Sequence, residues 1–589
     1  MSKAETVREI FKGAEEIPPA GDVAPHPDPF GPDGPPPLPE EEPLEAACAL
    51  YPLNDYGNGL RFTAYYGEDC LFAPRVGWHS WTGKVWRLDE DRLEVRALAQ
   101  RVSERILEEV PFVALEEHER RAIEAAEPAV DERAALALKD EVTAAEKKRA
   151  RELDRILEEA AEARKALGVR KRSHRSHAKA SGNTGAINNM LTEAQVKRAV
   201  SIARMNDDPL MINTLSGVVR IRQAVDPHAA EWGDATPVWG YEILPHSRDQ
   251  NISKIMPVEI DPEAACPTFD AFLCRIQPDP EIREFLQRWF GYTLTGLTAE
   301  QKLTFFYGVG RNGKSTLVDC IAEIMADYAT TVPIESLTGS EQRKGSDATP
   351  DLVRIPGARM VRASEPEQGQ RMKEALIKAL TGGEPILIRR MMQEFVEVKP
   401  EFKLTIQGNH KPEIRGGDDG IWRRVALVPF AEQIPVEEVD PLLPAKLRAE
   451  RSGIFNWLLA GCVKYMADGL REPASVTEAT RLYREESDPV RLFLLEECEI
   501  TGSDADFVIS RELVEAFRIW LEDRGDEPWG KRQASLQIRA RAGAFKHPET
   551  GATYAPLKRS DTGYIGIRFR PAIAARLAER RNQWPGEVR

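Results

Sequence analysis

The sequence has no cysteine pair at CxxC spacing and no apolar run near the roughly 18 residues that a membrane-spanning helix needs. Its seven cysteines are scattered, which argues against a zinc ribbon and a disulfide framework. The opening MSKAETVREIFKGAEEI lacks the charged-then-apolar layout of a signal peptide. We therefore expect a cytoplasmic protein with reduced thiols and no membrane partner.

Basic residues are outnumbered by acidic ones, and the net charge is −15. The distribution of charge matters more for nucleic-acid binding than the total. From Gly530 to Arg589, thirteen Lys and Arg stand against four acids, a net charge of +9. Either a solvated basic face or a phosphate-binding one fits this tail. An acid-free cluster, VRKRSHRSHAKAS, predicts a basic linker at about 168–182.

Composition changes along the chain suggest separate structural segments. Residues 1–45 are rich in proline and acids and are predicted to be disordered. Aromatic residues between turns at 54–89 are typical of a small β-rich unit. The proline-free, charged stretch at 132–167 predicts a helix. PLMINTLSGVVRI predicts strand–turn–strand, and residues 268–295 are helical by spacing.

The segment KLTFFYGVGRNGKSTLVDCIAEIMADYA combines an apolar strand, a glycine-rich loop and an amphipathic helix. Its loop fits GxxxxGK[ST], in which backbone N–H groups and a helix N-terminus cradle phosphate oxygens. Lys314 is expected to reach the β- and γ-phosphates, and Ser315 to bind Mg²⁺. The sequence therefore predicts an ATP site with Mg²⁺ as cofactor. The predicted nucleotide-binding residues are Gly308, Val309, Gly310, Arg311, Asn312, Gly313, Lys314, Ser315 and Thr316.

Such a site also needs an acid at the end of a neighbouring strand to hold the water bound to Mg²⁺. The stretch GARMVRASEPEQG offers Glu365 after a predicted strand, with Glu367 as a second candidate. An acid after a strand is common, so this feature alone is weak evidence for an acid that acts at a magnesium site.

Three further segments follow in order: MKEALIKALTGGEPILIRRMMQEFVEVKP, FKLTIQGNHKPEI and DDGIWRRVALVPF. With them, the run from Gly308 to Phe430 resembles the superfamily III helicases. Within that superfamily it is similar to the phage and plasmid primase–helicase family, which is related to the poxvirus primase–helicase. Weaker similarity extends over roughly residues 50–570. The resemblance implies an α/β fold: a P-loop, AAA+-like core with an α+β N-terminal domain, a helical collar and a C-terminal winged helix.

The predicted domains follow from this resemblance and from composition. They are a disordered tail at 1–45, an N-terminal helicase-associated α+β domain with the charged helix and basic linker at 46–262, a helical oligomerisation collar at 263–299, a superfamily III ATPase/helicase core at 300–432, a helical C-terminal part of the core at 433–484, and a basic winged-helix-like domain at 485–589.

The resemblance also implies catalytic roles. Glu365 would be the Walker B acid, binding Mg²⁺ together with Ser315, with Glu367 assisting. Asn409 would be the polar sensor that orients water against the γ-phosphate. Either Arg423 or Arg424 would be an arginine finger that reaches the ATP of a neighbouring subunit. Arg362 departs from the family pattern, because an apolar residue usually stands there in the Walker B strand.

Two groups of basic residues are predicted to bind DNA. Lys378, Arg389 and Arg390 flank a predicted strand–turn–strand, and in this superfamily a hairpin at that place grips one strand in the ring channel. A surface hairpin with solvated arginines is the alternative. The tail reads as three helices and a hairpin, an order that suggests a winged helix. Its third helix carries the second group, Lys531, Arg532, Arg539 and Arg541.

The leading hypothesis is an ATP-hydrolysing, hexameric DNA helicase that acts on single-stranded and forked DNA, 3′ to 5′, in replication of a phage, plasmid or integrated element. No primase motif precedes the helicase region, so a primase or polymerase would be a separate partner. The first alternative is an origin-binding initiator ATPase with little processive unwinding. The second is an ATPase scaffold that recruits replication proteins and whose ATPase activity is indifferent to DNA.

Overall fold

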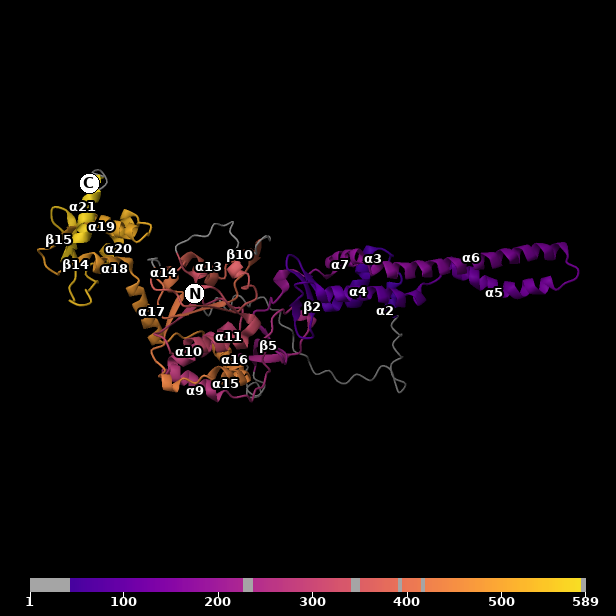
Figure 1. Cartoon of the computed structure of the whole chain (residues 1–589), viewed down its shortest axis with the longest axis horizontal. Helices are drawn as coiled ribbons and strands as arrows, with labels where there is room; N and C mark the ends of the chain where they lie inside the picture. Colours follow the sequence, from indigo (N-terminus) through magenta and orange to yellow (C-terminus); the bar gives the residue numbers. More distant parts are fainter. Residues whose placement is uncertain (1–42, 226–236, 340–349, 390–394, 415–418, 584–589) are drawn as a thin grey trace. The chain divides into compact units, whose positions relative to one another are not determined.

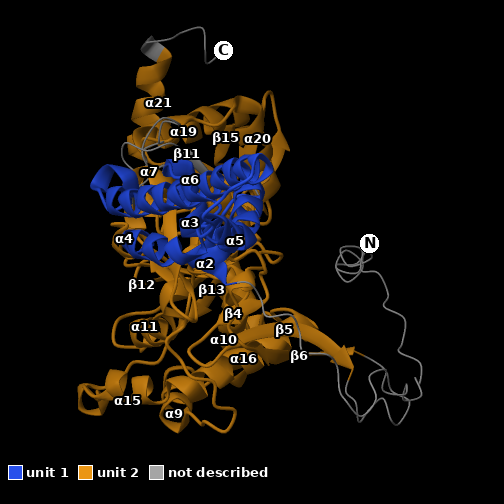
Figure 2. Ribbon diagram, turned by 90° about the vertical axis from the view of Figure 1, so that its right-hand side faces the viewer, with its two compact units in different colours: residues 1–65, 100–187 blue, residues 66–99, 188–589 orange. Residues whose placement is uncertain are grey.

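The computed structural model describes residues 43–225, 237–339, 350–389, 395–414 and 419–583. The predicted disordered tail therefore lies almost wholly outside the described residues. The chain divides into two units, one of residues 1–65 and 100–187 and the other of residues 66–99 and 188–589 (Figure 2). No helix in the described part of the chain is both long enough and apolar enough to cross a membrane.

The first unit is helical and is dominated by an antiparallel pair, α5 (Glu117–Ala137) and α6 (Ala144–Ser181), which lie side by side in Figure 1. Small buried residues such as Ala126 and Ala160 let the two helices approach closely. Ion pairs join the exposed edges, for example Arg133 to Asp154 at 2.7 Å. Helix α2 (Leu44–Cys48) also lies in this unit. Three further helices lie partly in it and run on into the second unit: α3 (Asp55–Tyr66), α4 (Leu93–Glu108) and α7 (Thr184–Arg198).

The basic stretch at 168–182 is not a linker, because α6 runs through it to Ser181. Its charges have partners that hold it in the helix: Arg170 donates hydrogen bonds to Glu119 of α5, and the buried His174 ring contacts Glu109 at 2.8 Å. Stretches without proline and rich in Lys, Arg and Ala favour helix. The charge pattern was therefore a poor guide to flexibility here.

Two of the small antiparallel sheets of the second unit precede its large sheet in the sequence. The aromatic segment predicted to be β-rich begins with helix α3 and then forms β1 (Cys70–Ala73), β2 (Gly77–Trp81) and β3 (Trp86–Leu88). The expected strand–turn–strand is present as β4 (Met211–Asn213) and β5 (Val218–Val225), with Met211 opposite Arg220. A third strand, β6 (Pro237–Leu244), extends this sheet.

A five-stranded parallel sheet, in the order β13-β7-β12-β9-β8, forms the centre of the second unit. Its strands are β7 (Leu303–Tyr307), β8 (Ala329–Thr331), β9 (Met360–Ser364), β12 (Lys403–Gly408) and β13 (Val425–Pro429). Parallel strands require crossover connections, and their near-continuous apolar sequences fit burial on both faces. The predicted α/β class is confirmed as a mixed α/β structure with a parallel sheet.

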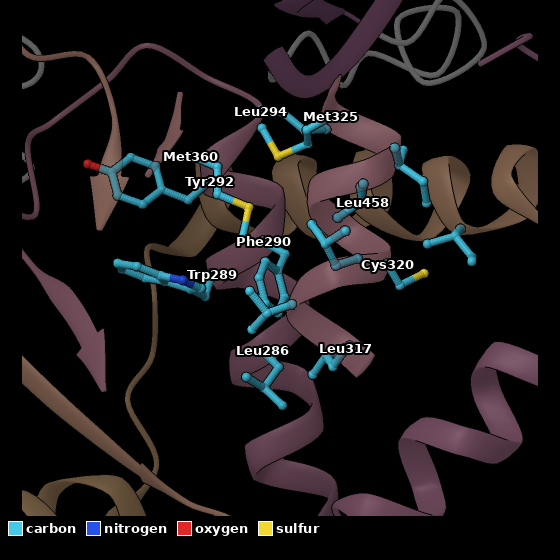
Figure 3. Packing of buried hydrophobic residues seen from close by; sticks show 14 of the residues in the cluster. Leu286, Trp289, Phe290, Tyr292, Leu294, Leu317, Cys320, Met325, Met360 and Leu458 are labelled. Atoms are coloured by element: carbon cyan, nitrogen blue, oxygen red, sulfur yellow. The ribbon is translucent and has the colours of Figure 1, made fainter. Parts of the chain in front are cut away.

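Helices cover both faces of this sheet. One face packs against α9 (Pro267–Ile276), α10 (Pro280–Thr293), α11 (Lys314–Met325), α15 (Leu443–Ala449) and α16 (Arg451–Asp468). Figure 3 shows the core between α10 and α11, where Phe290 and Leu286 meet Leu317. The opposite face packs against α12 (Ile334–Leu337), α13 (Glu374–Gly382), α14 (Asp419–Trp422) and α17 (Ala474–Glu486). Along the chain, α13 is followed by β10 (Ile386–Arg389) and β11 (Phe395–Val398), which pair as an antiparallel hairpin before β12.

The last hundred residues have a hydrophobic core of their own. Their elements are α18 (Pro489–Glu496), β14 (Cys498–Ile500), β15 (Phe507–Ile509), α19 (Ser510–Asp523), α20 (Lys531–Arg541), β16 (Ala555–Lys558), β17 (Thr562–Ile565), β18 (Ile567–Phe569) and α21 (Pro571–Gln583). The order of three helices followed by a hairpin agrees with the sequence expectation. Short strands β14 and β15 and the closing helix α21 are additions to it.

Candidate functional site

The predicted phosphate-binding loop lies at the carboxyl end of β7 and leads directly into α11. Three of its residues have positive φ angles: Gly310 at 23°, Arg311 at 52° and Gly313 at 75°. Successive residues in such conformations turn backbone N–H groups to one side and form a concave site for an anion. A Cβ atom on Gly308 would lie 2.2 Å from the carbonyl oxygen of Phe430, so only glycine fits there.

Lys314 is buried, with its ammonium group inside the loop. Its Nζ donates to the carbonyl oxygen of Gly308 at 2.7 Å, to Asn312 Oδ1 at 2.8 Å and to Asn409 Oδ1 at 3.3 Å. Burial lowers the pKa of Lys314, and the nearby charge of Glu365 opposes that shift. All three partners are neutral oxygens, which phosphate oxygens can replace as acceptors.

Asn409 follows β12, the strand between β7 and β9. Its Oδ1 also accepts a hydrogen bond from the backbone N–H of Gly310 at 3.2 Å. The structure thus brings the predicted sensor residue and the phosphate-binding loop into direct contact.

Glu365 follows β9 and is exposed at the same edge of the sheet. Its φ angle is 59°, a left-handed conformation that costs an L-amino acid other than glycine roughly 1–2 kcal/mol. The strained backbone is held by a hydrogen bond from Glu365 N–H to the carbonyl oxygen of Gln407 at 2.9 Å. Strain of this kind clusters at functional sites.

Glu367 is less suited to the catalytic role than Glu365. Its carboxylate accepts a hydrogen bond from Gln370 Nε2, and its backbone N–H donates to Gln370 Oε1, both at 3.3 Å. These contacts tie Glu367 to its own loop. The geometry therefore favours Glu365 of the two acids that the sequence left open.

No group of three or more His, Cys, Asp or Glu side chains in the described ranges could hold a metal ion alone. Magnesium in nucleotide sites usually takes one or two protein ligands and completes its shell with water and phosphate oxygens. The predicted ligands fit that pattern, since Ser315 is exposed at the start of α11 and Glu365 is exposed two strands away.

Arg423 and Arg424 lie at the opposite edge of the sheet from the phosphate-binding loop. They precede β13, whose residues Val425 and Pro429 stand opposite Leu303 and Tyr307 of β7. Five strand residues span about 16 Å at 3.3 Å per residue. Neither arginine is therefore placed to reach a phosphate bound in its own chain's loop.

The two arginines differ in their surroundings. Arg424 is buried and donates hydrogen bonds to the carbonyl oxygen of Gly420 and to Gln301 Oε1. Arg423 is exposed. An arginine that reaches into another subunit has to be exposed, so the structure favours Arg423.

The predicted strand–turn–strand is the β10–β11 hairpin, with Ile386 opposite Val398. Lys378 is half-buried on α13, and Arg389 ends β10. Arg390 lies outside the described residues. The DNA-binding role of these three residues stays a prediction.

The basic tail is less basic in the fold than in the sequence. Over residues 485–589 there are 17 Lys and Arg against 18 Asp and Glu, so this region has a net charge of −1. Several tail arginines pair with acids that come earlier in the region, as Arg568 does with Glu499 at 2.7 Å. Arg541, predicted to contact DNA, is half-buried in an ion pair with Asp488 instead. Arg541 is therefore not part of the exposed basic surface.

The other predicted bases of α20, Lys531, Arg532 and Arg539, are exposed. Lys546, in the loop after α20, and Lys558, at the end of β16, are exposed too, and sequence reasoning did not single them out. Within the described part of the chain, no carboxylate lies within ion-pair distance of Arg532, Arg539, Lys546 or Lys558. Pairing inside the domain thus concentrates the uncompensated positive charge on α20 and the β16–β17 hairpin.

Arg362, the unexpected base in β9, points to the edge of the sheet. It pairs with Asp319 on the exposed face of α11 and donates from Nε to Thr331 Oγ1 of β8 at 2.9 Å. The edge strand β8 has only three residues and leaves room for the side chain to reach solvent. This explains how a charged residue is accommodated in an otherwise apolar strand.

Comparison with known proteins gives matches over both halves of the chain. Residues 59–278 match the family described as D5 N terminal like, and residues 306–424 match a family of unknown function (DUF5906). The putative helicase L207/L206 of Acanthamoeba polyphaga mimivirus is 30% identical over 255 residues, which are 40% of this chain and 26% of that protein. The putative helicase 022R of Frog virus 3 (isolate Goorha) is 27% identical over 274 residues, 42% of this chain and 27% of that protein.

The chain thus spans about a quarter of the length of these curated relatives. Among solved structures, the apo C-terminal region of NrS-1 aligns with 53% of this chain and 77% of that chain. That alignment has 14% sequence identity and a TM-score of 0.32.

Proposed function

Because this chain belongs to the phage and viral primase–helicase family, we propose that it is an ATP-dependent DNA helicase that assembles as a ring and translocates 3′ to 5′ on single-stranded DNA. The curated relatives are named as putative helicases, which supports a helicase-like or replication function. The observation that carries the proposal is the meeting of Lys314, Asn409 and the phosphate-binding loop at one edge of the sheet.

The residues at this edge have complementary tasks in the proposed reaction. The loop N–H groups and Lys314 bind and orient the phosphates, and Asn409 positions the attacking water. Glu365 accepts a hydrogen bond from that water and polarises it. Ser315 and Glu365 would hold Mg²⁺, whose charge neutralises the phosphate oxygens.

The exposed Arg423 supports assembly into a ring, with the hexamer implied by the resemblance. A residue that acts in a neighbour's site makes a head-to-tail interface, and such interfaces close into rings when the rotation allows. The β10–β11 hairpin is the proposed contact with single-stranded DNA, through Lys378, Arg389 and Arg390. A separate primase or polymerase is the proposed partner at the fork.

Strand displacement on forked DNA tests the helicase proposal. Wild type should unwind the fork with ATP, and Lys314→Ala should not, because the phosphates lose their buried cation. Lys411→Ala is the matched control, since Lys411 lies near the site but pairs with Glu486 instead of a loop atom. A wild-type ring that hydrolyses ATP yet leaves the fork intact would contradict the helicase proposal.

Mixing variants tests the shared site. Lys314→Ala and Arg423→Ala should each be inactive alone as ATPases. Mixed in equal amounts, they should recover activity, because about one interface in four then combines an intact loop with an intact arginine. Absence of recovery from mixed rings would exclude Arg423 as a residue acting in the neighbouring subunit. Arg424→Ala removes a buried side chain, so any loss of activity in this variant should come from a lower stability of the fold.

One observation favours the alternative of an origin-binding initiator. The C-terminal region has its own core and exposes uncompensated bases on α20. Sequence-specific duplex binding by the full chain, with ATP hydrolysis but no processive unwinding, would support this second function.

A further inference from the structure

We propose that the second half of α6 carries a binding surface for the phosphate backbone of duplex DNA. Five exposed bases form this surface, and we call them the α6 stripe: Arg164, Lys165, Arg172, Arg175 and Lys179. The stripe belongs to the first unit of the chain, whereas the proposed helicase site is built from residues of the second unit. The proposal therefore goes beyond the proposed function and adds a DNA contact outside the helicase core.

The sequence around the stripe contains no acid. From Ala163 to Thr192 there are seven Lys and Arg and no Asp or Glu, whereas 30 residues should hold about five acids at the chain's average of 95 in 589. Among the residues that the structure describes, no carboxylate lies within ion-pair distance of the stripe. Its positive charge is therefore not neutralised by described residues.

Helical geometry gathers the five bases on one side of α6. At 3.6 residues per turn they fall within an arc of about 100° around the helix axis, and they extend over about 22 Å at 1.5 Å per residue. The only other residue of this arc between positions 164 and 179 is Gly168. Glycine destabilises a helix interior relative to alanine, and here it leaves room for a sugar–phosphate backbone to approach between the long side chains.

The opposite side of α6 is fixed to the rest of the unit. Arg170 donates a hydrogen bond to Glu119 at 2.8 Å. The ring of the buried His174 contacts Glu109 at 2.8 Å. These contacts use only part of the positive charge of the stretch, and they set the rotation of the helix about its axis. The stripe is therefore a preorganised surface on the unpacked side of α6.

Helix stabilisation accounts for one residue of the stripe. Bases near a helix C-terminus interact favourably with the helix dipole, but this effect falls off within the last turn. The last turn of α6 contains only Lys179 of the stripe. The remaining four bases need another explanation.

The residue types of the stripe favour duplex phosphates as the partner. Protein–protein interfaces have an apolar core and are depleted in lysine, and this arc holds no apolar side chain. Surfaces that bind single strands stack bases on aromatic side chains, and residues 163–192 contain no Phe, Tyr or Trp. Contacts from Lys and Arg to phosphates need neither feature. At about 3.4 Å per phosphate on one strand, the stripe spans about six phosphates of a duplex.

Fluorescence anisotropy with a short labelled duplex, measured without nucleotide at several salt concentrations, tests the proposal on the full chain. The variant combines Lys165→Ala, Arg172→Ala and Lys179→Ala. It should bind at least about tenfold more weakly than wild type, and the slope of log K against log salt should fall by about 3, one for each lost phosphate contact. Alanine favours helix, so the far-ultraviolet circular dichroism should not change.

The matched control removes the same charge from the first half of the same helix. It combines Arg149→Ala, Arg151→Ala and Arg155→Ala, where Arg149 pairs with Glu132 and Arg155 with Glu159. Its salt slope should equal that of wild type. A second variant keeps the charge of the stripe through Lys165→Arg, Arg172→Lys and Lys179→Arg, and it should bind the duplex as wild type does.

An unchanged slope in the triple alanine variant, or an equal fall in the control, would overturn the proposal. Lost single-strand binding with unchanged duplex binding would also overturn it. Unchanged duplex binding with lost binding of labelled poly-glutamate would replace DNA by an acidic protein as the partner. Because the assay contains no nucleotide, a chain that fails to unwind a fork would contradict the helicase proposal without affecting this result.

Discussion

The side-chain oxygen of Asn409 joins two elements of the phosphate-binding loop, since it accepts hydrogen bonds from Lys314 Nζ at 3.3 Å and from the backbone N–H of Gly310 at 3.2 Å. One residue at the end of β12 therefore contacts both Lys314 and the loop backbone. In a site that orients water against a phosphate, such a residue should affect the chemical step more than ground-state binding.

Replacing Asn409 with alanine should lower kcat for ATP hydrolysis by about 100-fold and change KM by less than about threefold. The magnitude follows from the effect of removing a single stabilising hydrogen bond from a transition state. Steady-state ATPase kinetics check it. His410→Ala, at the exposed neighbouring position, should retain kcat within about twofold. Equal losses in the two variants would mean that the loop, and not the amide of Asn409, is responsible.

Glu365 should show a trade-off between stability and activity because of its φ angle of 59°. Glu365→Gly should raise the free energy of unfolding by about 0.5–1 kcal/mol, since glycine adopts this conformation without steric cost but has more freedom when unfolded. The same change should abolish ATP hydrolysis. Urea unfolding and an ATPase assay measure the two effects. Glu367 does not have a positive φ angle, so Glu367→Gly should give no gain in stability.

The first unit should lose stability in acid through Glu119. Hydrogen bonds from Arg170 and from the backbone lower the pKa of this carboxyl from 4.5 to about 2. Because the folded state binds the proton more weakly, Glu119 stabilises the fold above pH 4.5, and that contribution disappears as the pH falls towards 2.

Glu119→Gln should therefore reduce the difference in urea midpoint between pH 7 and pH 3, followed by circular dichroism at 222 nm. Glu117, whose ion pair with Arg121 is exposed, provides the control. Its substitution Glu117→Gln should leave that difference nearly unchanged. A pH dependence unaffected by Glu119→Gln would place the acid-sensitive group elsewhere.

The exposed bases of α20 should bind duplex DNA through phosphates. Arg532→Ala combined with Arg539→Ala should weaken duplex binding and reduce the slope of log K against log salt by about 2, one for each lost contact. Fluorescence anisotropy at several salt concentrations measures the slope. Arg568→Ala, which breaks an exposed ion pair with Glu499, should leave it unchanged. A slope that stays constant in the double variant would contradict DNA binding by α20.

Local sequence patterns anticipated which residues of the proposed nucleotide site lie at one edge of the sheet, but they misjudged the charged regions. The common position of the glycine loop, Asn409 and Glu365 was predictable because each follows a short apolar strand, and parallel strands bring their carboxyl ends to one edge. The basic stretch before Gly182 was misread because its partners, Glu119 and Glu109, lie some 50 to 65 residues away. The tail appeared strongly basic because the acids that pair with it precede Gly530.

The choice between Arg423 and Arg424 likewise needed the structure. Two adjacent arginines differ only in burial, and burial is set by the packing of α14 and β13.

The position of Arg423, about 16 Å along the sheet from its own loop, has a consequence for rate measurements. If this arginine takes part in hydrolysis, an isolated chain lacks one component of its reaction centre however much nucleotide is supplied. The initial rate of ATP hydrolysis should then rise more steeply than in proportion to protein concentration. Dilution alone should abolish the activity per chain. Reaction order in protein, obtained from a simple dilution series, therefore reports on the geometry of a single sheet.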